Sequence, residues 1–314
     1  MSVGDDTHSA PRNGPSFPDG SFFLPAPRFM LRIALPNKGR LSDDARELFR
    51  DAGLEVRTSN DRALSASVSG VFDAIFVRAQ DIPEFVADGA ADAGITGWDL
   101  VVESGRELDK LSDLGFGKCR LVVAATEASG LTDLACIPPG ARVATSFPRT
   151  AERYFANLGR DVEVLPVSGA AEIAPHLGIA DVIIDLVSTG STLKTNGLHE
   201  VATVLESSAC IVGAPSRNDE RRAALDDLVA ALESVLRARG QRYLMANVRR
   251  DRLAAVRDVL PGISGPTVVD IMNGGDHVAV HAVVPAASIY RTVARLKALE
   301  AEGILVTRIE RLMP

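Results

Sequence analysis

The 314-residue sequence is poor in cysteine and aromatic residues and has no excess of positive charge. Three widely spaced cysteines without a C-x-x-C pair predict neither a disulfide framework nor a zinc site; they fit a reduced cytoplasm, with each thiol filling core space. The formal net charge of -7 argues against a nucleic-acid binder. No run of about 18 apolar residues is present, so we expect no membrane span. The cysteines are Cys119, Cys136 and Cys210.

Histidine is also scarce, with five residues in the whole chain. They form no cluster, and no Ser-His-Asp or Cys-His arrangement is suggested. We therefore expect each histidine to lie at the surface or to be satisfied in the core, and the chemistry to use other groups.

Residues 1–29 differ from the rest in composition. They are rich in Pro, Gly, Ser and Asp and lack the basic start and apolar stretch of a signal peptide, so we expect a disordered leader. The alternative is that translation naturally begins at Met30, where the first apolar strand opens.

From residue 30 onward, short apolar or β-branched runs alternate with helical segments, which indicates an α/β fold with parallel crossovers. Apolar spacing and end signals place a helix at 41–53, which has a Ser-Asp start and a Gly stop. Predicted strands cover 31–35, 72–78, 92–96, 120–126, 141–146, 162–167, 180–187 and 209–215, and further helices begin at 81 and cover 148–158, 170–178 and 217–240.

The last 75 residues follow a different order, β-α-β-β-α-β, which predicts a ferredoxin-like unit over 240–314. Its strongest local signal is the Asn-Gly-Gly-Asp turn at 273–276 between two alternating runs, which predicts a hairpin. Predicted strands cover 242–248, 267–272, 277–284 and 304–312, and predicted helices cover 251–260 and 286–303.

The segment DVIIDLVSTGSTLKTNG, residues 181–197, carries the clearest chemical signal. A buried strand delivers Asp185 to its carboxyl end, and a turn of small hydroxyl residues leads into a helix. Glycine allows close approach, while backbone amides, hydroxyls and the helix N-terminus suit a phosphate monoester. Asp185 would then accept hydrogen bonds from the ribose hydroxyls. The plain alternative is a helix cap. The turn contains Ser188, Thr189, Gly190, Ser191 and Thr192.

The longer string EIAPHLGIADVIIDLVSTGSTL, residues 172–193, closely resembles the signature of the ATP phosphoribosyltransferase family. The resemblance extends over essentially everything after residue 30, through LRIALPNKGRLSDDARELF, VRAQDIP, DAGITGWDL, LGFGKCRL, RVATSFP and ILVTRIERL. The residues in register within the signature are Glu172, Gly178, Asp181, Asp185, Thr189, Gly190, Thr192 and Leu193.

The resemblance implies a Mg²⁺-dependent condensation of ATP with 5-phosphoribosyl 1-pyrophosphate (PRPP), the first step of histidine biosynthesis. It implies a two-lobed catalytic domain of the periplasmic-binding-protein type II fold, followed by the ferredoxin-like regulatory domain. Lobe I would comprise 30–118 and 206–222, lobe II 119–205, a connecting helix 223–239 and the regulatory domain 240–314. The protein ligands of the metal stay undetermined.

This reaction needs charge stabilisation and positioning more than a nucleophile. We expect catalytic roles for Arg40, Arg78, Glu172 and Asp185, with Glu172 and Asp185 facing the sugar hydroxyls. Arginines can clamp phosphates bidentately, although each could also be a solvated surface charge. Gly94 and Thr96 could line the cleft or simply terminate a strand. The predicted ATP-binding set is Lys38, Arg40, Arg62, Arg78, Gly94 and Thr96.

The C-terminal unit resembles the histidine-binding domain of long-form enzymes, which implies feedback inhibition and assembly into dimers and hexamers. Thr267, in GPTVV, matches the family's segment near the effector. Asn247 stands where some relatives carry an acidic residue that would meet the effector's ammonium group, which leaves the strength of feedback open.

Two other classes share parts of this plan. A two-lobed solute-binding protein would have the catalytic fold, but it should carry a signal peptide and has no reason to keep the phosphate turn. A prephenate dehydratase also joins two lobes to a ferredoxin-like sensor, but its T-R-F segment does not occur in this sequence.

Overall fold

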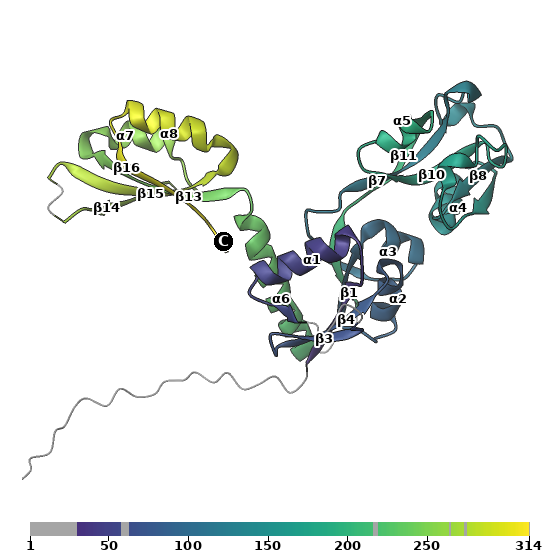
Figure 1. Ribbon diagram of the computed structural model, residues 1–314, viewed down its shortest axis with the longest axis horizontal. Helices are drawn as coiled ribbons and strands as arrows, with labels where there is room; N and C mark the ends of the chain where they lie inside the picture. The colour runs from purple at the N-terminus through teal and green to yellow at the C-terminus, as the bar shows by residue number, and fades with distance from the viewer. Residues whose placement is uncertain (1–29, 58–62, 216–218, 264, 273–274, 314) are drawn as a thin grey trace, which may run out of the picture. The chain divides into compact units, whose positions relative to one another are not determined.

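The computed structural model describes residues 30–57, 63–215, 219–263, 265–272 and 275–313, and within them three β-sheets (Figure 1). The predicted leader and Arg62 lie outside the described residues. Among the helices that are described, none has the length and apolar character needed to cross a membrane.

The first sheet has seven strands in the order β2-β3-β4-β1-β5-β12-β6. β4, β1 and β5 are parallel, and β12 runs antiparallel between β5 and β6. Ile33, Ile95 and Ile211 are fully buried at its centre, as expected for a sheet covered on both faces. The strands are β1 (Leu31–Pro36), β2 (Val56–Arg57), β3 (Ser65–Val68), β4 (Phe72–Val77), β5 (Ala93–Gly97), β6 (Asp109–Asp113) and β12 (Ala209–Gly213).

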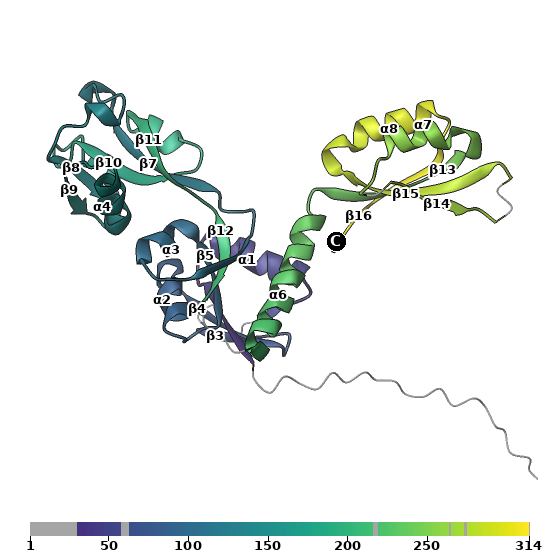
Figure 2. The same cartoon turned by 180° about the vertical axis from the view of Figure 1, so that it is seen from behind.

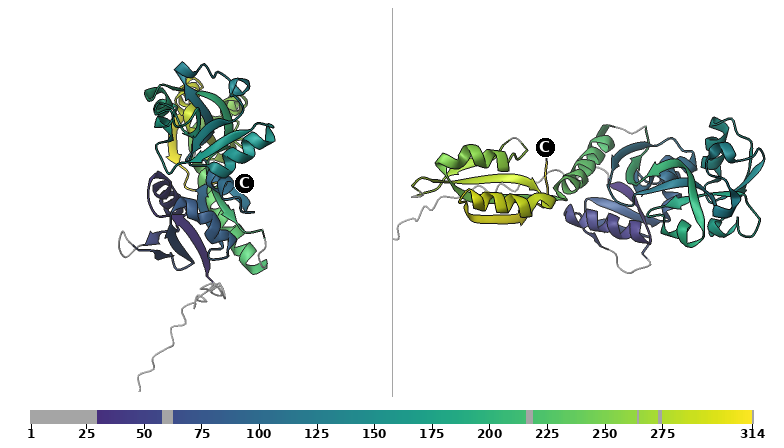
Figure 3. Two further views of the ribbon diagram at one scale, coloured as in Figure 1. Left: turned by 90° about the vertical axis from the view of Figure 1, so that its right-hand side faces the viewer. Right: turned by 90° about the horizontal axis from the view of Figure 1, so that it is seen from above.

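Four α-helices accompany this sheet. The 20-residue α6 is the longest and contacts α1, β1, β6 and β13; Figure 3 shows it as one uninterrupted green helix. Residues 217–218, the first two of the predicted helix 217–240, lie outside the described residues. The helices are α1 (Arg40–Asp51), α2 (Ile82–Ala87), α3 (Trp98–Ser104) and α6 (Asp219–Ala238), with a 3₁₀ turn, η1, at Ala79–Asp81.

The second sheet has five strands in the order β11-β7-β10-β8-β9, with β10 antiparallel to β7 and parallel to β8. Its strands are β7 (Cys119–Thr126), β8 (Ala141–Thr145), β9 (Val162–Pro166), β10 (Val182–Val187) and β11 (Leu198–Ser207). Its helices are α4 (Pro148–Asn157), α5 (Ser191–Thr195) and the 3₁₀ turns η2 (Glu127–Ser129), η3 (Leu134–Cys136) and η4 (Ala171–Ile173).

One predicted helix of this region is wrong. The segment 170–178 forms only the single 3₁₀ turn η4 followed by turns. Ala170 has a positive φ of 52°, Pro175 lacks an amide donor, and Gly178 has a φ of 67°, so a continuous α-helix does not form.

The chain passes between the two sheets twice, as the two-lobed fold requires. β6 in the first sheet is followed by β7 in the second, and β11 in the second is followed by β12 in the first. The predicted α/β two-lobed fold is therefore confirmed, and the crossing segments are 114–118 and residue 208.

The third sheet has four antiparallel strands in the order β14-β15-β13-β16, which confirms the ferredoxin-like unit. Figures 1 and 2 show α7 and α8 on one side of it. Residues 273–274 of the predicted hairpin turn lie outside the described residues. The elements are β13 (Gln241–Arg249), η5 (Arg250–Arg252), α7 (Leu253–Val259), β14 (Thr267–Asp270), β15 (His277–Pro285), η6 (Ala286–Ser288), α8 (Ile289–Ala298) and β16 (Glu302–Arg308).

Candidate functional site

The predicted phosphate turn lies between two buried anchors. Val187 ends β10 and Leu193 lies in α5, and both pack into one apolar cluster of the second sheet. The residues between them are mostly exposed, so their backbone and hydroxyls are open to solvent. We call residues 188–192 the phosphate loop.

Gly190 gives the phosphate loop its shape. It has a left-handed φ of 79° and stands at the N-cap of α5, a position where a residue with a Cβ is strained. No side chain caps the amides of α5, and the hydroxyls of Thr189 and Ser191 lie 3.0 Å apart. The start of α5 therefore has no side-chain cap and lies next to two hydroxyls that hydrogen-bond to each other.

Two carboxylates lie beside the phosphate loop. Asp185, near the end of β10, accepts a hydrogen bond from the Leu186 amide at 2.8 Å. Burial raises the pKa of Asp185; the Leu186 amide lowers it in part, and the nearby charge of Glu172 raises it further. Glu172 lies in η4, which packs against β10. The charge of Glu172 thus bears on the protonation of Asp185.

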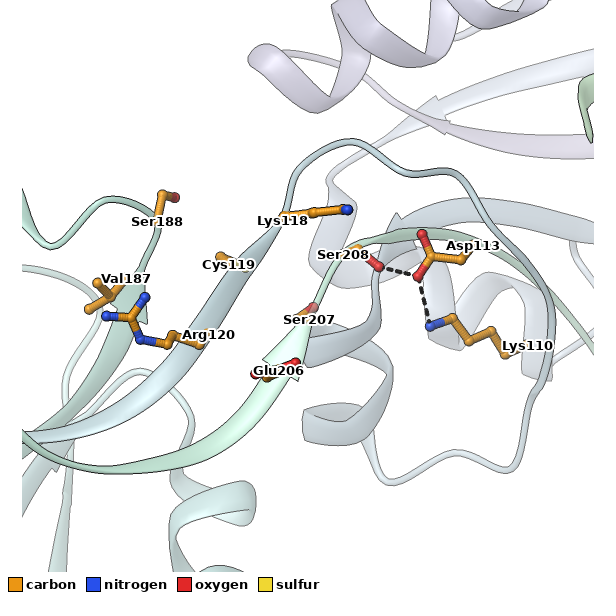
Figure 4. Close-up of a pocket in the computed structure, with 10 residues that line it drawn as sticks. All are labelled: Lys110, Asp113, Lys118, Cys119, Arg120, Val187, Ser188, Glu206, Ser207 and Ser208. Atoms are coloured by element: carbon orange, nitrogen blue, oxygen red, sulfur yellow. Dashed lines mark hydrogen bonds and ion pairs between the residues drawn. The ribbon is translucent and has the colours of Figure 1, made fainter. Parts of the chain in front are cut away.

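A cavity of about 490 Å³ adjoins the first residue of the phosphate loop, Ser188 (Figure 4). It carries three cationic side chains. Lys110 pairs with Asp113 at 3.3 Å, and Arg120 pairs with Glu200 at 2.6 Å. Across the described residues, no carboxylate lies within ion-pair distance of the exposed Lys118. The cavity is lined by Lys110, Asp113, Lys118, Cys119, Arg120, Val187, Ser188, Glu206, Ser207 and Ser208.

Three predicted nucleotide-binding cations lie at the carboxyl ends of parallel strands. Lys38 follows β1, Arg40 begins α1, and Arg78 follows β4; all three are exposed. The Asn37 amide donates to the Val77 carbonyl at 2.8 Å, so the loops after β1 and β4 are joined. Among the described residues, the ion pair of Arg40 is a 4.0 Å contact with Asp44.

Gly94 and Thr96 are buried in β5. A Cβ on Gly94 would lie 2.3 Å from Ile82 Cγ2, so glycine permits the close packing of α2. The Thr96 hydroxyl donates to the Ala79 carbonyl at 2.7 Å. Both residues have a packing role, and their contact with a nucleotide stays a prediction.

The two predicted effector residues lie on the third sheet. Asn247 in β13 pairs with Ala279, and Thr267 in β14 pairs with His281, both partners lying in β15. The strand β15 therefore separates them. The same sheet holds a Tyr243 hydroxyl 2.7 Å from His281 Nδ1.

Comparisons with known proteins decide the family. The family described as ATP phosphoribosyltransferase matches residues 78–234, and that described as HisG, C-terminal domain, matches 238–311, a range containing β13 to β16. An ATP phosphoribosyltransferase of Gemmatimonas aurantiaca is 68% identical over 292 residues, covering 91% of this chain and 100% of the relative. The chain belongs to the ATP phosphoribosyltransferase family.

Other relatives agree with this assignment. An ATP phosphoribosyltransferase of Natronomonas pharaonis is 48% identical over 285 residues, covering 90% of this chain and all of the relative. A chain of the ATP phosphoribosyl transferase (HisG:HisZ) complex from Thermotoga maritima superposes with a TM-score of 0.59 at 27% identity, covering 66% of this chain and 99% of that one.

The family assignment fixes the reaction. The chain is a pentosyltransferase of histidine biosynthesis whose substrates are ATP and PRPP, and its family typically uses a metal. The prephenate dehydratase and solute-binding alternatives are set aside by relatives with this activity that match over their whole length.

Sequence reasoning missed the cations of the cavity. Lys110 was not among the candidates, and Lys118 and Arg120 entered only as part of LGFGKCRL, without a predicted role. The available signal was the basic pair flanking Cys119 at a crossing between the two sheets. Within the described residues, no group of three or more His, Cys, Asp or Glu side chains could hold a metal ion.

Proposed function

We propose that the phosphate loop holds the 5-phosphate of PRPP during transfer of the phosphoribosyl group to ATP. The observation that carries this proposal is the mostly exposed turn around Gly190, where no side chain caps the start of α5 and the hydroxyls of Thr189 and Ser191 lie 3.0 Å apart. Amides and hydroxyls in this arrangement bind a phosphate without a lysine.

Asp185 and Glu172 then accept hydrogen bonds from the ribose hydroxyls of the same substrate. Asp185 lies three residues before the phosphate loop, and this position supports the role. The ribose hydroxyls and the 5-phosphate belong to one small ligand, so the groups that bind them should lie close together in the chain. A carboxylate that binds the hydroxyls also stabilises positive charge on the ribose as the transition state forms.

The phosphates of ATP are bound by four cationic side chains, those of Lys38, Arg40, Arg62 and Arg78. The floor of the nucleotide site is formed by Gly94 and Thr96. Their support is the shared edge of the first sheet and the hydrogen bond that joins the loops after β1 and β4. Ligands of open parallel sheets bind at this edge. Arg40 and Arg78 are catalytic in this proposal because they steady the charge on the reacting phosphates.

The reaction is a displacement at the anomeric carbon. The lone pair of adenine N1 forms the new C–N bond while the C–O bond to pyrophosphate breaks, and pyrophosphate leaves with the bonding electrons. The residues of this chain hold the two substrates in line and stabilise the separated charges.

The metal in this proposal is Mg²⁺. The candidate donors, Asp185 and Glu172, are carboxylates, and hard oxygen ligands are those that Mg²⁺ prefers. Mg²⁺ takes many of its ligands from phosphates and water, so it needs no cluster of three protein side chains. When bound, it neutralises charge on the pyrophosphate oxygens.

The C-terminal unit is proposed to bind histidine as a feedback inhibitor, using Asn247 and Thr267. The proposed domains are lobe I (30–118 and 206–222), lobe II (119–205), the connecting helix (223–239) and the regulatory domain (240–314). The match to a C-terminal family domain at 238–311 supports this division. We also propose a cytoplasmic homo-oligomer, a dimer or hexamer.

The proposal is tested by following the new nucleotide chromophore formed from ATP, PRPP and Mg²⁺. Asp185→Ala should lower kcat/KM for PRPP by about 100-fold, because it removes contacts that strengthen in the transition state. A matched control is Asp133→Ala on the same sheet unit, whose carboxylate caps η3. Equal rates for both variants and the parent would refute the site assignment.

A further inference from the structure

Two consecutive serines at one crossing between the sheets donate hydrogen bonds to two different aspartates. Ser207, the last residue of β11, donates to Asp99 Oδ1 at 2.5 Å. Ser208, the residue before β12, donates to Asp113 Oδ2 at 2.5 Å (Figure 4). Asp99 lies in the first turn of α3, and Asp113 ends β6. The crossing is therefore fastened to two elements of the first sheet.

The Ser207–Asp99 pair is buried and reciprocal. Only 5% of Asp99 and 7% of Ser207 is exposed. Besides accepting from the serine, Asp99 donates its backbone amide to Ser207 Oγ at 2.9 Å. Removing one partner of such a pair leaves a buried polar group unsatisfied, so this geometry is strongly preferred over alternatives.

The same pair constrains its neighbours. A Cβ on Gly97 would lie 2.4 Å from Asp99 Oδ1, so the glycine makes room for the carboxylate. The Trp98 amide donates to the Ser208 carbonyl at 3.0 Å. The start of α3 and the crossing thus form one hydrogen-bonded unit.

This unit is close to the phosphate loop through the second sheet. Ser207 of β11 pairs with Cys119 of β7, and the next residue of β7, Arg120, pairs with Val187 of β10. Ser188 follows Val187 directly. The direction in which β11 leaves Ser207 therefore affects where the phosphate loop lies relative to the first sheet.

We propose that Ser207 and Asp99, supported by Ser208 and Asp113, are positioning residues that set the phosphate loop relative to the nucleotide-binding edge of the first sheet. This inference rests on the proposed function, since it assumes that the two substrates are held by different sheets. Each substrate binds its own sheet without the pair, but transfer requires both reacting atoms in line. Misplacement by about 1 Å can cost about 100-fold in rate.

The test compares Asp99→Ala, Asp99→Asn and Ser207→Ala in the full chain, by steady-state kinetics and by ATP binding to the free enzyme. We expect Asp99→Ala and Ser207→Ala each to lower kcat by about 10- to 100-fold while the Kd for ATP changes by less than about threefold. Asp99→Asn should keep kcat within about threefold of the parent, because its amide oxygen still accepts from Ser207.

The matched control is Ser234→Ala, which removes another buried serine hydroxyl, one that donates to Ala231 within α6. Its kcat should equal the parent's. The Asp99→Ala/Ser207→Ala double variant should be no slower than Ser207→Ala, because Ser207→Ala already removes both hydrogen bonds of the pair. If Asp99→Ala or Ser207→Ala fails to fold, the single variants Asp99→Asn and Ser208→Ala are compared instead. Ser208→Ala should then lower kcat and leave the Kd for ATP unchanged.

An unchanged kcat in folded Ser207→Ala would overturn the inference, and so would a parallel loss of ATP affinity. A defect in Asp99→Asn equal to that of Asp99→Ala would also overturn it, because the hydrogen bond would not be what matters. The proposed function is judged separately by Asp185→Ala. If Asp185→Ala is impaired and Ser207→Ala is not, only the positioning role is refuted. If Ser207→Ala is impaired and Asp185→Ala is not, the assignment of the phosphate loop is refuted instead.

Discussion

The backbone amide of Asn37 donates a hydrogen bond to the carbonyl of Val77 at 2.8 Å. It joins the loop that carries Lys38 to the segment that carries Arg78, although the two cations are 40 residues apart in the sequence. Both then lie at the carboxyl edge of the parallel strands β1 and β4. We therefore expect one polyanion to contact both.

This relationship predicts that Lys38→Ala and Arg78→Ala will each raise the KM for ATP by about 10-fold, because each removes one charge-assisted contact to phosphate. The KM for PRPP should change little. Arg57→Ala, at an exposed ion pair with Glu55 on the same sheet, is the control and should leave both KM values unchanged. A larger effect on PRPP than on ATP would contradict the division of the substrates between the sheets.

The raised pKa of Asp185 predicts a conflict between stability and function. Since burial favours the neutral acid in the folded state, ionised Asp185 costs folding free energy; the cost is absent below the ordinary pKa of 3.8 and complete above the raised value. Asp185→Asn should therefore raise the melting temperature at pH 7 by about 1–3 °C, and the gain should vanish on acidification. The variant should be nearly inactive.

Asp181, the residue before β10, has a pKa shift of the opposite sign. Its hydrogen bonds from Arg142 lower its pKa, so its carboxylate stabilises the fold above pH 3.8 and loses this effect as the pH falls through the lowered value. Asp181→Asn should lower the melting temperature at neutral pH. Equal shifts for both variants would contradict the assigned environments.

Gly190 should not tolerate a side chain. Its φ of 79° costs an alanine about 1 kcal/mol or more, and relief of that strain would turn the amides of α5 away from the phosphate. We expect Gly190→Ala to raise the KM for PRPP by about 10-fold or more. Gly159→Ala, with a φ of 65° at the end of α4, matches the backbone strain away from the site and should change stability alone.

The feedback role predicts that a folded chain lacking residues 240–314 is insensitive to histidine. It also predicts that Asn247→Asp strengthens inhibition, because a carboxylate would attract the effector's ammonium group. The control is Asn157→Asp, at the end of α4. Inhibition curves at fixed substrate concentrations measure both effects, and retained inhibition in a folded truncation would exclude the sensor role.

Local patterns predicted most of the fold, and the errors have identifiable causes. The ferredoxin-like order was readable because its apolar periods change cleanly between two and 3.6 residues. The strand β6, Asp109–Asp113, escaped prediction because its sequence DKLSD is polar and it lies at the edge of its sheet. The ten-residue β11 was missed because its irregular pairing with β7 obscures the alternation.

The same distinction between local and long-range information applies to the candidate site. The proposed phosphate loop is contiguous, so its residue types and spacing were sufficient to single it out as a candidate. The contact between Asp99 and Ser207 joins residues 108 positions apart and depends on how two sheets share one crossing. No pattern within either segment contains that information.

The central claim is that the phosphate loop holds the ribose 5-phosphate. The most direct test measures the affinity of the free enzyme for PRPP in the presence of Mg²⁺ by titration calorimetry. The variants compared are Thr192→Ala and Thr195→Ala, the latter at the opposite end of α5. The account predicts at least about a 10-fold weaker Kd in Thr192→Ala and a parental Kd in Thr195→Ala. A parental Kd in both variants would contradict it.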